Sequence, residues 1–399
     1  MSDAPWLTIV GLGEDGPDGL APASQDALAK ADVVIGPPRH LSLLPDLKAE
    51  IREWPVPFAD GLEILKSLRG RRVVALASGD PFWFGAGSVI ARTFPRAEWQ
   101  VLSAPSTFAL AAARMGWPVE TSVCLGLHAS PLSRMRPHLA PGVRILALLR
   151  DGDAVKEMAE YLSAEGFGAS EVTALQALGG PGERVERFTA QAGPDADLTH
   201  PVCAAIEVAG DGAVVTAASG LDDTLFDSDG QITKRPMRAL TLSALAPRPF
   251  ERLWDIGGGS GSIAIEWLLS HPSTEAISVE VRADRAQRIA ENAARLGVDR
   301  LRVVTGEAPE ALTDLPDPDV VFVGGGLSER LLGTLAGRCA PGTRLVANAV
   351  TLESEALLTH WQGTAGGTLL RIELAEAHPL GQRRGWRAAY PVVQWSMTL

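Results

Sequence analysis

The stretch LWDIGGGSGSIAIEW, at residues 253–267, constrains the fold of this chain more than any other part of its sequence. An apolar run ends at Asp255, small residues follow, and a helix-like pattern begins after them. The glycines at 257, 259 and 261 let the backbone come close to a ligand and present its N–H groups. The stretch therefore predicts a strand that turns tightly around a nucleotide-like ligand and enters a helix.

The C-terminal part of the sequence alternates between strand and helix patterns around this turn. The predicted strands are 253–256, 276–281, 301–304, 320–323 and 345–348, and the helices between them include 262–269 and 284–296. Such alternation indicates a doubly wound parallel sheet. Residues 369–375 and 390–397 are expected at an antiparallel end of this sheet.

The N-terminal part also alternates, and no repeat relates it to the C-terminal part. Its predicted strands are 7–10, 32–35, 73–77, 99–102, 143–149, 171–175 and 202–208, with a helical pattern at 153–165. Between the two parts, the sequence is rich in Gly, Asp and Ser, which is typical of a linker. We therefore expect one α/β domain over 1–210, a linker over 211–228 and a second α/β domain over 229–399.

Charge and cysteine content narrow the function. A net charge of −12 disfavours a nucleic-acid partner, although a local arginine cluster can still bind a polycarboxylate. Cys124, Cys203 and Cys339 lack zinc-ligand or redox spacing, so we expect free thiols and no bound metal. The first residues do not read as a signal peptide, and no apolar run is long enough to span a membrane. A soluble, cytoplasmic protein is expected.

The spacing of the glycines distinguishes between nucleotide cofactors. A dinucleotide fingerprint places its third glycine at 262, where this chain has Ser262. The pattern here, Asp255-x-Gly-x-Gly-x-Gly, resembles the first motif of the Rossmann-like S-adenosylmethionine (SAM) methyltransferases. Glu280 ends the next predicted strand, where a carboxylate can accept both ribose hydroxyls. An acid there also suits NAD, so an NAD-dependent oxidoreductase remains an alternative.

This resemblance implies a SAM site built from the turn and from the loops after neighbouring strands. In TGEAPEAL, at 305–312, the residues after the third strand are expected against the adenine. The candidate cofactor-binding residues are Thr233, Asp255, Gly257, Gly258, Gly259, Ser260, Gly261, Glu280, Glu307 and Ala308.

Three stretches of the N-terminal part form a second group. They are WLTIVGLGEDGPDGL at 6–20, ALASGDPFWFGAGS at 75–88 and LSAPSTFALAAARMGWP at 102–118. In this order they resemble the tetrapyrrole methylases, a separate SAM-dependent fold of two α/β subdomains. The resemblance implies a cofactor cleft bordered by Gly11, Gly13, Gly79, Asp80, Pro81, Phe82, Ser106 and Thr107.

Further blocks extend the resemblance over nearly the whole chain. They are GPPRHLSLLP at 36–45, LGGPGERVERFTA at 178–190, DGQITKRPMRALTLSAL at 229–245, VFVGGG at 321–326 and NAVTLE at 348–353. The ordered set resembles the decarboxylating precorrin C5,15-methyltransferases of vitamin B12 biosynthesis. That family implies a C5-methylating N-terminal domain, a C15-methylating and decarboxylating C-terminal domain, two SAM sites, a tetrapyrrole substrate and a homo-oligomer.

The implied chemistry needs positioning more than acid–base catalysis. An enamine-like carbon attacks a methyl group without a strong base, and arginine forks suit the substrate carboxylates. The catalytic candidates are Lys234, Arg235, Asn348 and Thr351, and the carboxylate-binding candidates are Arg238, Arg383, Arg384 and Arg387. His40 and His128 are candidates for proton transfer. A methyltransferase for another small molecule with a regulatory N-terminal domain, and a non-catalytic scaffold, remain alternatives.

Overall fold

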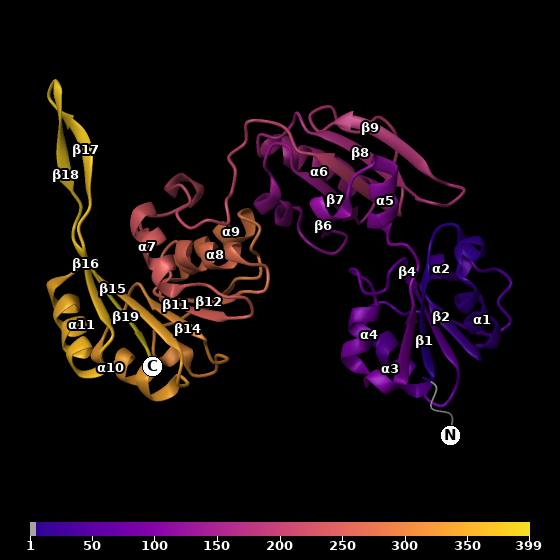
Figure 1. The fold of residues 1–399 in the computed structure, drawn as a ribbon, viewed down its shortest axis with the longest axis horizontal. Helices are drawn as coiled ribbons and strands as arrows, with labels where there is room; N and C mark the ends of the chain where they lie inside the picture. The colour runs from indigo at the N-terminus through magenta and orange to yellow at the C-terminus, as the bar shows by residue number, and fades with distance from the viewer. Residues whose placement is uncertain (1–4) are drawn as a thin grey trace. The chain divides into compact units, whose positions relative to one another are not determined.

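The computed structural model describes residues 5–399 and divides the chain into two compact units (Figure 1). The first unit comprises the chain up to residue 132 together with 138–213, and the second comprises 133–137 and 214–399. The first domain expected from the sequence begins at residue 1, and its residues 1–4 lie outside the described part. Both units are α/β structures, as expected.

The first unit begins with a five-stranded parallel sheet in the order β3-β2-β4-β1-β5. Every residue of β1 and β2 is buried, because both faces of a parallel sheet are covered. Its strands and helices are β1 (Leu7–Leu12), α1 (Pro22–Lys30), β2 (Val33–Gly36), α2 (Pro38–Ser42), β3 (Glu50–Glu53), α3 (Asp60–Ser67), β4 (Val73–Ser78), α4 (Gly87–Thr93) and β5 (Trp99–Leu102).

A second five-stranded sheet completes this unit, in the order β6-β7-β10-β8-β9. The β6 and β7 strands are parallel, and the remaining pairs are antiparallel. Its elements are α5 (Thr107–Met115), β6 (Val123–Gly126), β7 (Arg144–Leu149), α6 (Gly152–Ala164), β8 (Glu171–Gln176), β9 (Arg184–Thr189) and β10 (Val202–Glu207). The two sheets are the two α/β subdomains that the tetrapyrrole methylase resemblance implies.

The second unit contains a seven-stranded sheet in the order β13-β12-β11-β14-β15-β19-β16. The first five strands are parallel. At the end of the sheet, β19 pairs antiparallel with both β15 and β16, as the predicted antiparallel end implies. Its elements are α7 (Arg235–Leu245), β11 (Arg252–Ile256), α8 (Ser262–Ser270), β12 (Glu275–Glu280), α9 (Ala283–Arg295), β13 (Arg302–Thr305), β14 (Val320–Val323), α10 (Glu329–Arg338), β15 (Arg344–Ala349), α11 (Leu352–Ala365), β16 (Thr368–Ile372) and β19 (Val392–Thr398).

A hairpin between the last two strands of this sheet was not predicted. It consists of β17 (Ala375–Leu380) and β18 (Arg383–Ala388), which pair only with each other and extend away from the sheet (Figure 1). Its side chains Leu380 and Trp386 are 71% and 79% exposed. Since most hairpin residues are exposed, the sequence there carries little of the burial pattern that reveals strands elsewhere.

Residues 214–228, within the segment that the sequence indicates as a linker, contribute to the core of the second unit. Val215, Leu221 and Phe226 are buried in its main hydrophobic cluster. The Glu266 carboxylate on α8 accepts hydrogen bonds from the backbone N–H groups of Gly220 (2.6 Å) and Leu221 (2.9 Å). Both apolar packing and hydrogen bonds therefore make this segment an integral part of the second unit.

Arg238 joins this segment to the rest of the unit and does not reach a ligand. Its side chain is fully buried, and its guanidinium forms ion pairs with Glu266 and with Asp223 (3.0 Å). It also donates to the carbonyl oxygens of Leu221 and Thr233. The expectation that Arg238 binds a substrate carboxylate is therefore wrong, because its donors are used inside the fold.

Among residues 5–399, no helix is long and apolar enough to cross a membrane. In the same range, no group of three or more His, Cys, Asp or Glu side chains is arranged to hold a metal ion.

The buried Arg238–Glu266 pair predicts a stability defect without a catalytic one. Arg238→Met leaves a buried carboxylate and two carbonyl groups without their partner, so we expect unfolding of the second unit to become about 3–5 kcal/mol easier. The full chain is unfolded in urea, and hydrogen exchange of peptides from the second unit measures the free energy of unfolding of that unit. The matched control is Arg282→Met, which removes an exposed pair with Asp284 (2.8 Å) and should change little. Wild-type stability in Arg238→Met would contradict the structural role.

Candidate functional site

A cavity of about 1100 Å³ opens in the second unit at the carboxyl ends of its parallel strands. This is where ligands bind in doubly wound sheets. Twelve residues that the sequence nominated line it, namely Thr233, Lys234, Asp255, Gly257, Gly258, Gly259, Ser260, Glu280, Glu307, Ala308, Asn348 and Arg387. The structure thus brings most of the predicted second site together.

The glycine loop after β11 lies against the loop after β14. A Cβ atom at Gly257 would come within 2.6 Å of the Gly325 backbone, so only glycine permits this approach. Gly257 and Gly259 have φ values of +74° and +60°, which favour glycine. Gly261, also nominated as a cofactor residue, caps α8 and lies against Ile289 instead of lining the cavity.

Two carboxylates lie beneath this loop. Asp255 is 1% exposed and accepts a hydrogen bond from the Ser278 hydroxyl (3.1 Å). Burial, together with the charge of Glu280, raises the pKa of Asp255 to about 7. Glu280 accepts from the backbone N–H groups of Gly259 (2.9 Å) and Arg282 (3.0 Å). Each of its oxygens can accept a second bond, so Glu280 supports the loop and can still accept hydroxyl groups of a ligand.

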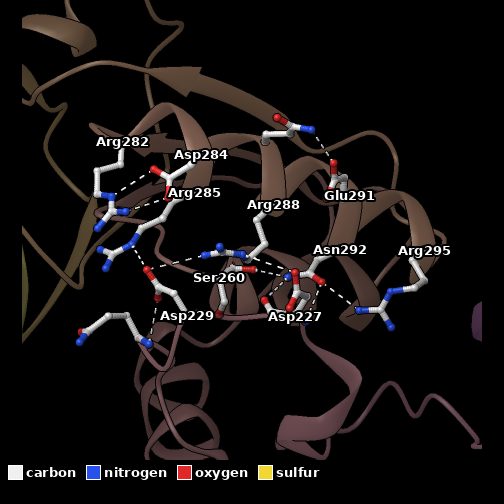
Figure 2. A network of polar contacts seen from close by, with 12 residues as sticks. Asp227, Asp229, Ser260, Arg282, Asp284, Arg285, Arg288, Glu291, Asn292 and Arg295 are labelled. Carbon is white, nitrogen blue, oxygen red and sulfur yellow. Dashed lines mark hydrogen bonds and ion pairs between the residues drawn. The ribbon is translucent and has the colours of Figure 1, made fainter.

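Asn292 on α9 links the glycine loop to the segment that precedes α7 (Figure 2). Its amide nitrogen donates to the carbonyl oxygens of Ser260 (3.0 Å) and Asp227 (2.9 Å). Its amide oxygen accepts from the Asp227 N–H (2.9 Å) and from Arg295 (2.9 Å). Because this buried amide uses all its hydrogen-bonding capacity, it holds two walls of the cavity at a set separation.

A second set of contacts, at Asp229, also binds the segment before α7 to α9, at a point closer to the cavity. The Asp229 carboxylate accepts from Arg285 (2.9 Å) and forms an ion pair with the Arg288 guanidinium (3.7 Å). Figure 2 shows these side chains together. Arg285 also lines the cavity, as does Gln231. No sequence motif pointed to this network, because its members come from a loop and a helix that meet only in the folded unit.

Asn348 lines the cavity, but its side chain is already engaged. It donates to the Thr241 hydroxyl (2.9 Å) and accepts from Gln394 (3.0 Å). Thr351 does not line the cavity, since its hydroxyl caps α11 by accepting from the Ser354 N–H (3.2 Å). Other nominated residues that the structure places outside the cavity lining are the exposed Arg235, Arg383 and Arg384.

Several lining residues were missed by the sequence analysis. The base of the unpredicted hairpin and the residues beside it contribute Ala375, Glu376, His378 and Tyr390. The glycines of VFVGGG also line the cavity, although this block entered the sequence analysis only as part of the family resemblance. A glycine run directly after a strand was the available signal for these.

A second cavity, of about 560 Å³, lies within the first unit. The nominated residues Gly13, Gly79, Asp80, Ser106 and Thr107 line it. Ser106 caps α5 by accepting from the Ala109 N–H (3.1 Å), and the Asp80 carboxylate accepts from the Phe82 N–H (2.9 Å).

Gly11, Pro81 and Phe82 do not line this cavity. A Cβ atom at Gly11 would collide with the Gly79 carbonyl oxygen, so this glycine allows the end of β1 to approach the loop after β4. Gly79 has a φ of +48°, and a Cβ there would lie 2.8 Å from the Pro105 carbonyl oxygen. The glycines thus shape the cavity wall, whether or not they face the ligand.

His40 and His128, the candidates for proton transfer, both line this cavity. Burial, together with the charges of Arg39 and His200, lowers the pKa of His40 to about 3. Burial also lowers the pKa of His128. Both side chains are therefore neutral near pH 7, and His40 is a very weak base.

Two known families match the chain, each over one part. Tetrapyrrole (Corrin/Porphyrin) Methylases match residues 6–192, and the Precorrin methyltransferase domain matches residues 224–399.

Named relatives agree with these families. A Precorrin-6Y C(5,15)-methyltransferase (decarboxylating) of Sinorhizobium sp. is 50% identical over 401 residues, covering 99% of this chain and 97% of the relative. A Cobalt-precorrin-6B C(15)-methyltransferase (decarboxylating) of Salmonella typhimurium is 31% identical over 166 residues, 40% of this chain and 85% of the relative. The crystal structure of the C-terminal domain of a Rhodobacter capsulatus precorrin-6Y C5,15-methyltransferase is 54% identical, with a TM-score of 0.45 over 46% of this chain and 100% of that chain. From the full-length match, this chain belongs to the family of decarboxylating precorrin-6Y C(5,15)-methyltransferases.

Proposed function

We propose that this protein methylates C5 and C15 of a precorrin and decarboxylates one of its acetate side chains, in cobalamin biosynthesis. Membership of a methyltransferase family implies SAM as the methyl donor. The observation that carries the proposal is the presence of two cavities, each bordered by the glycine loop of a different methyltransferase fold. We propose one SAM site in each cavity.

In the second unit, the residues present fit SAM. SAM supplies an electrophilic methyl group when it is bound. Asp255 lies where its carboxylate can face the cationic part of the donor, and Glu280 where it can accept ribose hydroxyls. Glu307 and Ala308 border the space for the adenine, and Thr233 lies at the edge of the same cavity.

Positioning supplies most of the catalysis in this proposal. An electron-rich ring carbon needs alignment with the methyl group in a site that excludes water, and no strong base. Lys234 and Arg387 line the cavity and are exposed, so they can hold substrate carboxylates that do not react. Asn348 is a positioning residue, since its amide is held by Thr241 and Gln394.

The two reactions are assigned to different units. We propose that the first unit methylates C5, and that the second methylates C15 and releases carbon dioxide. The Salmonella relative supports this division, because an enzyme named only for the C15 step with decarboxylation matches 40% of this chain. We also propose that the protein works in the cytoplasm as a homo-oligomer, which the free thiols and the family resemblance, respectively, support.

Loss of one glycine loop should remove one SAM site and one reaction. Gly259→Val and Gly79→Val each force a β-branched residue to a positive φ at a cavity wall. We expect equilibrium dialysis to show two SAM per wild-type chain and one per variant chain. By mass spectrometry, the Gly79→Val product should gain one methyl group and lose carbon dioxide, and the Gly259→Val product should gain one methyl group only.

Matched controls separate loss of a site from backbone strain. Gly381→Val has the same φ as Gly259, +60°, and Gly116→Val a φ of +65°, and a Cβ at either position meets nothing within 4 Å. Both controls should bind two SAM. Binding of a single SAM by the wild-type chain, with substrate present, would refute the two-site proposal.

The raised pKa of Asp255 predicts that SAM binding to the second unit depends on pH. The cationic donor favours the ionised carboxylate, so binding releases a proton wherever the free carboxyl is protonated, which is below about pH 7. Affinity should therefore weaken by up to about tenfold for each pH unit below 7 and level off above it.

Calorimetry between pH 5.5 and 7.5 on the Gly79→Val chain measures this dependence at the second site alone. Asp255→Asn in the same chain should bind more weakly and with little pH dependence. An equally steep dependence in Asp255→Asn would assign the titration to another group.

A further inference from the structure

A charged cluster lies on one wall of the first-unit cavity, apart from the residues nominated for SAM. Glu14 follows β1, Arg39 and His40 belong to α2, and Ser78 ends β4, so three neighbouring strands bring the cluster together. All four residues line the cavity. None of them is needed to explain how the glycine loops form.

Arg39 is the centre of this cluster. Its guanidinium forms an ion pair with Glu14 and donates to His40 Nε2 (2.8 Å) and to the Ser78 hydroxyl (3.1 Å). Its side chain is 29% exposed and that of Glu14 is 18% exposed, so the pair is open to the cavity without being free in water. Among the described residues that line this cavity, Arg39 is the only arginine or lysine.

The side chains of His40 and His128 add no positive charge to this cavity wall near pH 7. Since Arg39 has only donors, His40 Nε2 must accept, which places the proton of the neutral ring on Nδ1. That buried Nδ1 has no hydrogen-bond partner in the described structure. The lowered pKa values of His40 and His128 agree with neutral rings. The permanent cation of the cavity wall is therefore Arg39.

The carboxylate of Glu14, which belongs to the chain itself, is the ion-pair partner of Arg39. Its backbone lies against the loop after β8, where a Cβ at Gly180 would come within 2.6 Å of the Glu14 carbonyl oxygen. Glu14 also directly follows Gly13 of the cofactor loop. An arginine fork accepts any carboxylate of suitable geometry, and exchange of one for another preserves the local charge balance.

We propose that Arg39 anchors one carboxylate of the tetrapyrrole at the C5 site, and that Glu14 holds this place when no substrate is bound. This inference rests on the proposed function. A polycarboxylate gains more from the single cation than SAM does, because the one carboxylate of SAM is outweighed by its sulfonium and ammonium groups. His40 and Ser78 act as positioning residues, because they fix the orientation of the guanidinium.

The two partners of the ion pair should give opposite effects on substrate binding. Arg39→Gln should raise the KM for the precorrin in C5 methylation about 10- to 100-fold, with kcat and SAM affinity nearly unchanged. Glu14→Gln should lower that KM about 2- to 5-fold, since the substrate no longer displaces a carboxylate. A merely structural ion pair would give defects of the same sign. Arg39→Lys, which keeps the charge and loses the fork, should be intermediate.

The control is a similar ion pair outside the cavity. Arg114 pairs with Glu183 (2.6 Å) in the same unit, so Arg114→Gln and Glu183→Gln should leave this KM unchanged. SAM binding to the first unit reports whether each variant is folded. A KM unchanged in Arg39→Gln, an equal rise in Glu14→Gln, or loss of SAM affinity in place of substrate affinity would each overturn the proposal.

A binding assay separates failure of this inference from failure of the proposed function. Fluorescence titration with uroporphyrin, a stable polycarboxylate macrocycle, needs no turnover. Uroporphyrin affinity that falls in Arg39→Gln and rises in Glu14→Gln would support the anchor even in a chain that does not methylate a precorrin. If wild type methylates C5 but Arg39→Gln binds uroporphyrin and the precorrin as tightly as wild type does, the role of Arg39 is refuted and the proposed function stands.

Discussion

The close approach of two backbones, at Gly257 and Gly325, is the constraint on which the second unit depends. No side chain larger than hydrogen fits at Gly257, so the loops after β11 and β14 come together and leave a cavity at the strand ends. The Gly259 N–H then bonds to Glu280, and Asn292 ties the same loop to the segment before α7. The site is thus held largely through main-chain groups, which provide a rigid frame for chemistry that relies on alignment.

The two cavities differ in their electrostatics. The larger cavity buries Asp255 and Glu280 under its glycine loop, which suits a cationic donor. The smaller cavity has the neutral side chains of His40 and His128, and its permanent cation is Arg39, already paired with Glu14. Each therefore carries a carboxylate near the place proposed for SAM. In the smaller cavity that carboxylate, Glu14, is ion-paired with Arg39, whereas Asp255 and Glu280 accept hydrogen bonds from a hydroxyl and from backbone N–H groups. This difference is the physical basis for expecting substrate recognition to be distributed unequally between the units.

Patterns of burial explain which elements were predictable. Strands covered on both faces, such as β1 and β11, are nearly continuous apolar runs and were found within a few residues. The missed strands β3, β6 and β9 all lie at sheet edges, where one side has no neighbour. β3, with the sequence EIRE, is mostly exposed, and no residue of β9 is buried, so both strands lack that signal. For the same reason the β17–β18 hairpin, and the cavity wall that it forms, could not be seen in the sequence.

The sequence by itself determined both fold classes, the antiparallel end of the second sheet and the glycine loops that border the two cavities. These follow from local rules, because glycine spacing and strand–helix alternation act over short stretches of chain. Only the tertiary structure decided which charged residues line a cavity. Arg238 and Arg387 look equivalent in sequence, but one pairs with the buried Glu266 while the other lines the cavity. The role of an arginine is set by partners distant in sequence, and only folding brings those partners within hydrogen-bonding distance.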